Sequence, residues 1–193
     1  MLIEDLIGSS IQLERSALRK LQEQCSQYLE ESRGLPLFKA LPSTYSDIHR
    51  VKARLQKRIG SVDDAFNNAF GQAFPNLHQR AIFASAAIPI LSESTESFYI
   101  LPVNGYRFMY SCDVANSAVQ IEEMMQSISN QFRCPTSAGE VVADILKHKY
   151  ISTDLHEGII SESEIIFYGI PCYYAVRVNS CDAYATLMPS LHI

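Results

Sequence analysis

The order of strand-like and helix-like segments constrains the fold of this 193-residue chain more than any other feature. Short runs of β-branched or aromatic residues come in groups. These groups are separated by stretches in which apolar residues recur every three or four positions. Regular alternation of single strands and helices would predict a parallel sheet, whereas this grouping predicts an α+β domain. The expected strands are 37–41, 81–85, 97–101, 106–110, 162–168 and 172–178, and the expected helices include 10–32, 114–132 and 137–146.

The composition is that of one globular domain over residues 1–193, with residues 1–33 as an N-terminal helical segment. The hydrophobic fraction of 47% and the charged fraction of 19% are sufficient for a sizeable core. The net charge of −5 argues against a general nucleic-acid binder. No apolar run approaches the ~18 residues that span a bilayer, and the N-terminus lacks the basic start of a secretory signal. We therefore expect a soluble protein that acts inside a cell or is carried within a particle.

Cysteine and histidine are spread thinly along the chain. The five cysteines include no Cys-x-x-Cys pair, and the five histidines form no His-Glu-x-x-His motif. Neither spacing predicts a zinc site or a disulfide framework. Because each cysteine lies in or beside an apolar stretch, the sequence predicts free, structural thiols and no metal.

A second helix is predicted to begin at Ser46, which is a suitable N-cap. Its apolar face would hold Ile48, Val51, Leu55 and Ile59. Its other face would be basic and is either a solvated surface or a site for a partner or a diphosphate. A small nucleic-acid-binding protein is a further alternative that depends on this face alone. The basic face takes five of the chain's 16 Lys and Arg residues: Arg50, Lys52, Arg54, Lys57 and Arg58.

Two further local signals predict elements in the middle of the chain. Ser61-x-x-Asp64 resembles a capping box at the start of a helix that carries Phe66 and Phe70. Pro102-Val103-Asn104-Gly105 predicts a turn, so that the strands on either side of it would form a hairpin.

Two carboxylates, Glu162 and Glu164, stand immediately before an apolar, β-prone run. On a strand, residues i and i+2 point to the same face, so both side chains would project together from one edge of a sheet. Like charges this close repel, and strand packing does not require them. The pair is either a functional site or a solvated strand edge whose charges prevent aggregation.

Three separated segments together resemble the mono-ADP-ribosyltransferase fold, and in particular the transferases encoded by tailed bacteriophages. The first is the helix and strand over residues 25–40, which contains Gly34-Leu35-Pro36-Leu37-Phe38-Lys39-Ala40. The second is the strand that ends in Ser85, followed by a Pro-x-x-Gly-aromatic-Arg-Phe segment within residues 100–108. The third is the acidic strand with Glu162 and Glu164. The resemblance implies a mixed, mostly antiparallel split sheet packed by helices.

The resemblance also implies a chemistry, in which NAD is the substrate and no metal is needed. Glu164 would stabilise the positive charge that develops on the ribose when the bond to nicotinamide breaks. Glu162 would orient or deprotonate an arginine-like acceptor. Ser85 would support the nicotinamide pocket or position Glu164, and Lys39 would meet the NAD diphosphate or ribose. The acceptor would be a host protein, or alternatively nucleic acid, in the bacterial cytoplasm, with the enzyme made there or carried in the virion.

The chain departs from the family pattern at two places. Phe38-Lys39-Ala40 stands where the family has Tyr-Arg-Gly, so the cation lacks the planar guanidinium fork that grips phosphate and ribose together. Ala86 stands where a glycine often follows the strand-ending hydroxyl. Two alternatives therefore stay open: an active transferase, and a catalytically inactive protein that uses the same fold as a binding or virion-associated module.

Overall fold

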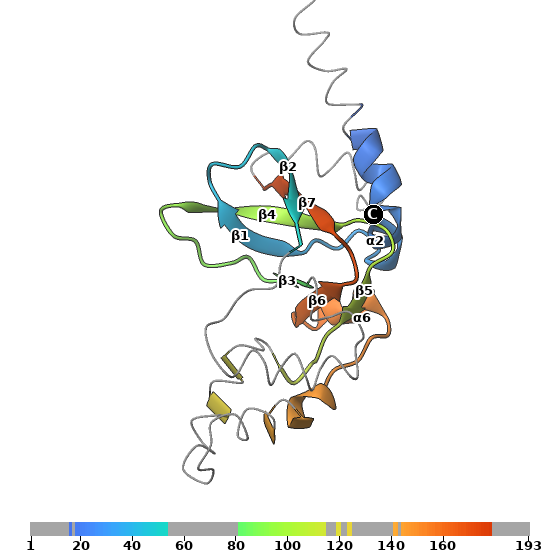
Figure 1. The fold of residues 1–193 in the computed structure, drawn as a ribbon, viewed down its shortest axis with the longest axis vertical. Coiled ribbons are helices and arrows are strands. Elements are labelled where there is room, and N and C mark those ends of the chain that lie inside the picture. The colour runs from blue at the N-terminus through green and yellow to red at the C-terminus, as the bar shows by residue number, and fades with distance from the viewer. Residues whose placement is uncertain are drawn as a thin grey trace, which may run out of the picture.

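The computed structural model describes residues 16, 18–53, 81–114, 119–120, 123–124, 141–142 and 144–178. Helical backbone occurs at 18–24, 119–120, 123–124, 141–142 and 144–147, in addition to two fully described helices. Helices and strands are both present and grouped, which confirms the α+β class (Figure 1). The described elements are α2 (Ser26–Glu31), β1 (Phe38–Pro42), β2 (Ile48–Lys52), β3 (Ala81–Ser85), β4 (Thr95–Pro102), β5 (Arg107–Met109), α6 (Leu155–Ile160), β6 (Glu164–Tyr168) and β7 (Cys172–Arg177).

The strands form one seven-stranded sheet in the order β2-β7-β4-β1-β3-β6-β5. Each pair of neighbours in the described part of the chain is antiparallel. The β1–β3 pair is joined at one position only, Phe38 opposite Ser85, whereas β1 pairs with β4 over five residues. The sheet is therefore forked: β2, β7, β4 and β1 lie above β3, β6 and β5 in Figure 1, and the two halves diverge after Phe38.

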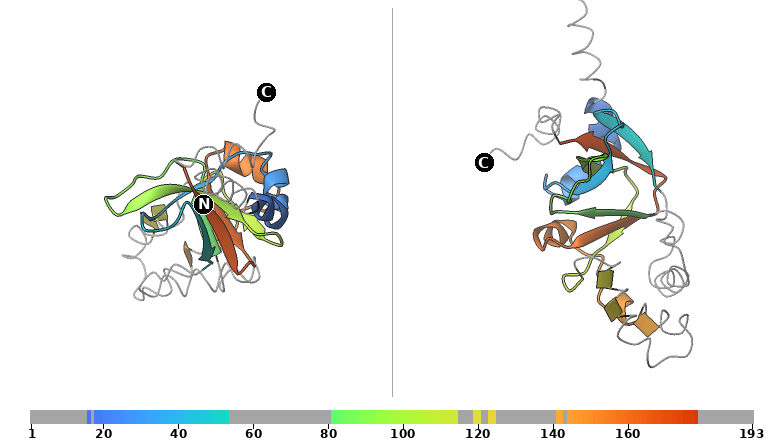
Figure 2. Two further views of the ribbon diagram at one scale, coloured as in Figure 1. Left: turned by 90° about the horizontal axis from the view of Figure 1, so that it is seen from above. Right: turned by 90° about the vertical axis from the view of Figure 1, so that its left-hand side faces the viewer.

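Successive side chains of β6 belong in turn to two different hydrophobic clusters, so both faces of the β3-β6-β5 half are covered. Ile165 and Phe167 belong to the main core, which also holds residues from α2, β1, β4, β7 and α6. Ile166 and Tyr168 belong to a second cluster with residues from the helical segments at 141–142 and 144–147. Two further views show these layers from above and from the side (Figure 2).

The described part of the N-terminal helical segment packs as its apolar spacing predicts. Leu21, Cys25 and Tyr28 are fully buried, and the ring of Tyr28 meets the edge of Phe167 with centroids 6.1 Å apart. The helix is interrupted at Cys25 and ends after Glu31. A turn with positive φ at Arg33 and Gly34 then leads into β1.

The predicted helix from Ser46 is wrong, because residues 48–52 form β2, an outer strand that pairs with β7. The three-residue spacing of Ile48 and Val51 fits a helix, but a short β-prone run fits an edge strand equally well. Arg50 and Lys52 are exposed, and basic side chains are common on such edges. Leu55, Ile59 and the rest of the basic face (Arg54, Lys57 and Arg58) lie outside the described residues, as does the helix expected after Ser61.

The predicted hairpin across residues 102–105 is also wrong. The turn itself forms, with Gly105 at φ +88°, but β4 pairs with β1 and β7 while β5 pairs with β6 at the far edge of the sheet. The reason is that the turn is fastened to the N-terminal helical segment. Asn104 N–H donates to the Gln24 carbonyl at 2.7 Å, and Gln27 N–H donates to Asn104 Oδ1 at 3.0 Å. The turn thus carries the chain over the helix and away from β4.

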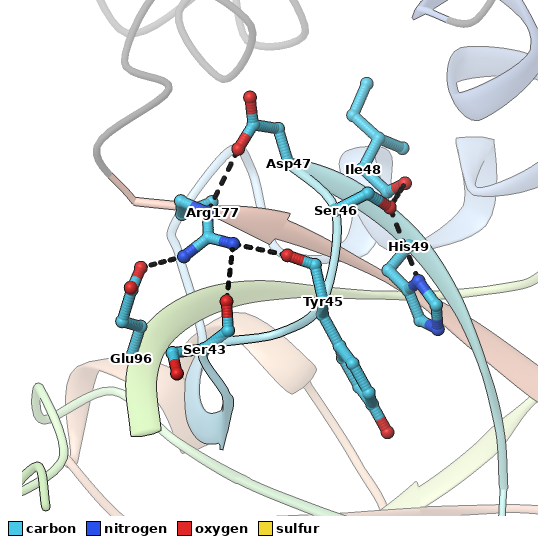
Figure 3. A network of polar contacts seen from close by, with 8 residues as sticks. All are labelled: Ser43, Tyr45, Ser46, Asp47, Ile48, His49, Glu96 and Arg177. Carbon is cyan, nitrogen blue, oxygen red and sulfur yellow. Dashed lines mark hydrogen bonds and ion pairs between the residues drawn. The ribbon is translucent and has the colours of Figure 1, made fainter. Parts of the chain in front are cut away.

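Arg177, at the end of β7, holds the loop between β1 and β2 against the sheet (Figure 3). Its guanidinium donates to the Asp47 carboxylate at 3.0 Å, to the Ser43 carbonyl at 3.1 Å, and also to the Tyr45 carbonyl and the Glu96 carboxylate. It also lies over the ring of Phe98, 5.1 Å from the centroid. One side chain therefore connects two strands, β7 and β4, with the loop that follows β1.

Candidate functional site

Ser85 and Glu164, predicted as site residues from segments 79 positions apart, lie directly opposite each other in the sheet. Ser85 is the last residue of β3, as predicted, and Glu164 is the first residue of β6. Directly opposed residues in an antiparallel pair point to the same face, with Cβ atoms about 4.5–5.5 Å apart. Both side chains are half-buried, so a hydroxyl and a carboxylate lie on the same face of the sheet beside the fork.

Lys39 reaches into the same fork from β1. Its backbone position shares a face with the buried residues Leu37 and Leu41, and its long side chain crosses the fork, where Nζ donates to the Phe83 carbonyl of β3 at 2.8 Å. Phe38, its neighbour, faces Ser85 across the single β1–β3 pairing position. The ring of Phe38 lies 5.3 Å from that of Tyr99 and forms an aromatic wall beside the fork.

The electrostatics also connect Lys39 with Glu164. Burial lowers the pKa of Lys39 from its ordinary value of 10.5, because desolvation disfavours the charged amine. The neighbouring Glu164 carboxylate raises the pKa of Lys39 and so offsets part of that effect. The fork therefore holds a cation, a carboxylate and a hydroxyl supplied by the three strands β1, β6 and β3.

Glu162 does not share the strand with Glu164, contrary to the expectation of two carboxylates on one face. β6 begins at Glu164, and Glu162 lies in the preceding turn with φ +55°. Its N–H donates to the Ile159 carbonyl at 3.0 Å, and the residue is exposed. The physical reason is that the left-handed backbone at Glu162 breaks the alternation by which i and i+2 would face the same way.

This arrangement suits chemistry at a carbon that becomes positively charged. A half-buried carboxylate stabilises such a charge better than a fully solvated one, because the local dielectric is lower. A nearby ammonium suits a phosphate or another anion in the same ligand. The exposed Glu162, in the turn before β6, can accept a proton from a group that approaches from solvent.

Sequence reasoning missed α6, the helix that delivers the chain to Glu162 and Glu164. Its signal was present: Asp154-x-x-Glu157 fits a helix start, and Asp154 Oδ1 accepts from the Glu157 N–H at 3.2 Å. Gly158 lets this helix approach Tyr110, since a Cβ at that position would lie 2.7 Å from the tyrosine ring. The Phe83 carbonyl, by contrast, is a backbone group and has no signature in the sequence.

A metal site finds no support among the described residues. No group of three or more His, Cys, Asp or Glu residues could hold a metal ion there. Within the same residues, Cys25, Cys112 and Cys172 are free thiols, whereas Cys134 and Cys181 lie outside them. None of the described helices is long and apolar enough to cross a membrane.

Comparisons of the chain with protein-family models, curated protein sequences and solved structures find no match.

Proposed function

We propose that the protein is a mono-ADP-ribosyltransferase that transfers ADP-ribose from NAD to a side chain of a host protein. The site is the fork between β1, β3 and β6. On the resemblance to phage transferases, the enzyme acts in the cytoplasm of a bacterial host or travels in the virion.

In this proposal each site residue has one role. Glu164 lies beside the nicotinamide ribose and stabilises the oxocarbenium-like charge as the bond between C1′ and the nicotinamide nitrogen breaks. The bonding electrons leave with neutral nicotinamide. The acceptor nitrogen attacks C1′ with its lone pair, and its proton passes to Glu162. Ser85 holds Glu164 in position, and Lys39 faces the diphosphate.

The observation that carries the proposal is the convergence of three polar residues at the fork of the sheet. Lys39, Ser85 and Glu164 come from separate segments, yet Ser85 opposes Glu164 and Lys39 interacts with both strands that carry them. A half-buried ammonium beside a half-buried carboxylate has a desolvation cost that apolar side chains would avoid, which supports a functional role for Lys39 and Glu164.

A second candidate, a non-catalytic binding module with this fold, is favoured by one observation. Lys39 is half-buried and already donates to the Phe83 carbonyl, as expected of a residue that joins the two sheet halves. Ala40, in place of the family's glycine, points in the same direction. The two candidates differ in whether NAD is consumed.

The test is incubation with labelled NAD and a bacterial lysate. Wild-type protein is expected to release nicotinamide and to label a lysate protein. Glu164→Gln is expected to reduce both by about a hundredfold or more, and Lys39→Met to weaken NAD binding measured by calorimetry. Glu93→Gln, which removes an exposed carboxylate in the β3–β4 connection, is the matched control. Absence of both NAD turnover and NAD binding in the folded wild type would favour the binding module.

A further inference from the structure

The turn between α6 and β6 holds Glu162 in a backbone conformation that a glutamate rarely adopts. Its φ of +55° lies in the left-handed region, which is unfavourable for residues with a Cβ. Non-glycine residues persist there only when their surroundings enforce it. At the end of α6 the Glu162 N–H donates to the Ile159 carbonyl, and the flanking residues Ser161 and Ser163 add side-chain hydrogen bonds to the same turn.

The two serines form a directed chain of hydrogen bonds. Ser161 Oγ donates to the Gly158 carbonyl at 2.9 Å and lies 2.8 Å from Ser163 Oγ. Each hydroxyl has a single proton, so Ser163 must donate to Ser161 while Ser161 donates to Gly158. Ser163 is only 2% exposed, which makes this partner important for a polar group removed from water. These bonds tie the two neighbours of Glu162 to the last turn of α6, the helix labelled next to β6 in Figure 1.

The turn separates two carboxylates that an extended chain would place on one face. With β6 extended backwards by two residues, Glu162 would lie beside Glu164 and the two charges would repel. In the structure Glu164 is half-buried in the sheet and Glu162 is exposed outside it. The separation leaves one carboxylate for the ribose and the other for a group that arrives from solvent.

We propose that Ser161 and Ser163 are positioning residues that hold Glu162 for the acceptor in ADP-ribosyl transfer. This inference rests on the proposed function. The serines touch neither NAD nor acceptor; they act through the backbone of Glu162. Their loss therefore affects transfer to an acceptor more than it affects the hydrolysis of NAD by water, because water needs less exact orientation than a protein side chain.

The experiment compares Ser161→Ala, Ser163→Ala, Ser161→Thr and the control Ser152→Ala, which alters an exposed serine ahead of α6. Two quantities are measured. The first is the ratio of protein-bound label to released nicotinamide, with labelled NAD and lysate. The second is the set of backbone chemical shifts of Glu162 by NMR, which reports its conformation whether or not NAD is consumed. Thr keeps the hydroxyl at position 161, so Ser161→Thr tests rescue by a conservative change.

We expect both alanine variants to shift the Glu162 resonances and to lower the transfer ratio about tenfold, while Ser161→Thr and Ser152→Ala resemble wild type. Unchanged Glu162 shifts in Ser161→Ala and Ser163→Ala would overturn the inference and leave the proposed function standing. Shifted resonances with an unchanged ratio would show that the turn is structural only. A wild type that consumes no NAD would overturn both proposals, and the NMR result would still show whether the serines hold the turn.

Discussion

Replacement of Arg177 by methionine removes the main connection between the β1–β2 loop and the sheet while keeping a long apolar stem. The guanidinium in Figure 3 is largely buried, with 16% of its side chain exposed, and donates to two backbone carbonyls as well as to two carboxylates. After the change, the Ser43 and Tyr45 carbonyls and the Glu96 carboxylate lose a charged donor.

The contacts of Arg177 set the size of the effect. The Asp47 carboxylate is 70% exposed, so that ion pair contributes only about 0.2–1 kcal/mol. A hydrogen bond from a charged donor to a shielded carbonyl contributes about 1.5–3 kcal/mol, and the cation–π contact with Phe98 about 0.5–1 kcal/mol. These terms are not additive, since one side chain makes all of them. We expect Arg177→Met to lower the free energy of unfolding by about 2–4 kcal/mol.

Urea unfolding followed by circular dichroism measures this change through the shift of the midpoint at constant slope. Asp47→Asn is the matched control and should cost less than about 1 kcal/mol. Arg177→Lys, which keeps the charge but not the planar fork, should fall between the two. A free energy of unfolding for Arg177→Met within about 0.5 kcal/mol of wild type would show that Arg177 does not hold the β1–β2 loop against the sheet.

Two further predictions concern packing and pH. Gly158→Ala places a Cβ 2.7 Å from the ring of Tyr110, and this overpacking should lower the free energy of unfolding by about 1–3 kcal/mol, as measured by thermal unfolding. In the control Gly105→Ala, the added Cβ lies in open space, so the only cost is the strain of a positive φ. Burial, with a smaller contribution from Cys172, raises the pKa of the Cys25 thiol from 9.0 to about 12. Because the unfolded thiol ionises first, stability due to Cys25 is present below pH 9 and declines by about 1.4 kcal/mol per pH unit between pH 9 and 12. Cys25→Ala should remove that decline; an identical pH dependence in wild type and variant would contradict the burial argument.

The sequence predicted correctly those elements whose structure depends on interactions between residues close together in the chain. β1, β3 and β7 appear where apolar runs are bounded by proline, serine or glycine, and the helix through Tyr28 follows its own spacing. The helix expected at 48–59 and the hairpin across Gly105 failed for a different reason. In both cases the local pattern was sound, but pairing with β7 and the hydrogen bonds of Asn104 to the N-terminal helical segment decided the outcome.

The candidate site was also predictable only in part, because some of its features depend on long-range pairing. The order of Lys39, Ser85 and Glu164 along the chain, interpreted through the family resemblance, predicted a shared site, but only long-range pairing brings β3 beside β6. The contact of Lys39 with the Phe83 carbonyl could not be predicted, because every residue has a carbonyl. The position of Glu162 was predicted wrongly, since alternation along a strand assumes an extended backbone and Glu162 has a left-handed one.

In the proposed function, NAD binds in the fork between β1, β3 and β6. Titration of isotopically labelled protein with NAD, followed by amide NMR shifts, tests it most directly. We expect saturable shifts at Lys39, Ser85 and Glu164, with small changes on β2 at the outer edge of the sheet. Shifts absent from all three residues, or confined to β2, would contradict it.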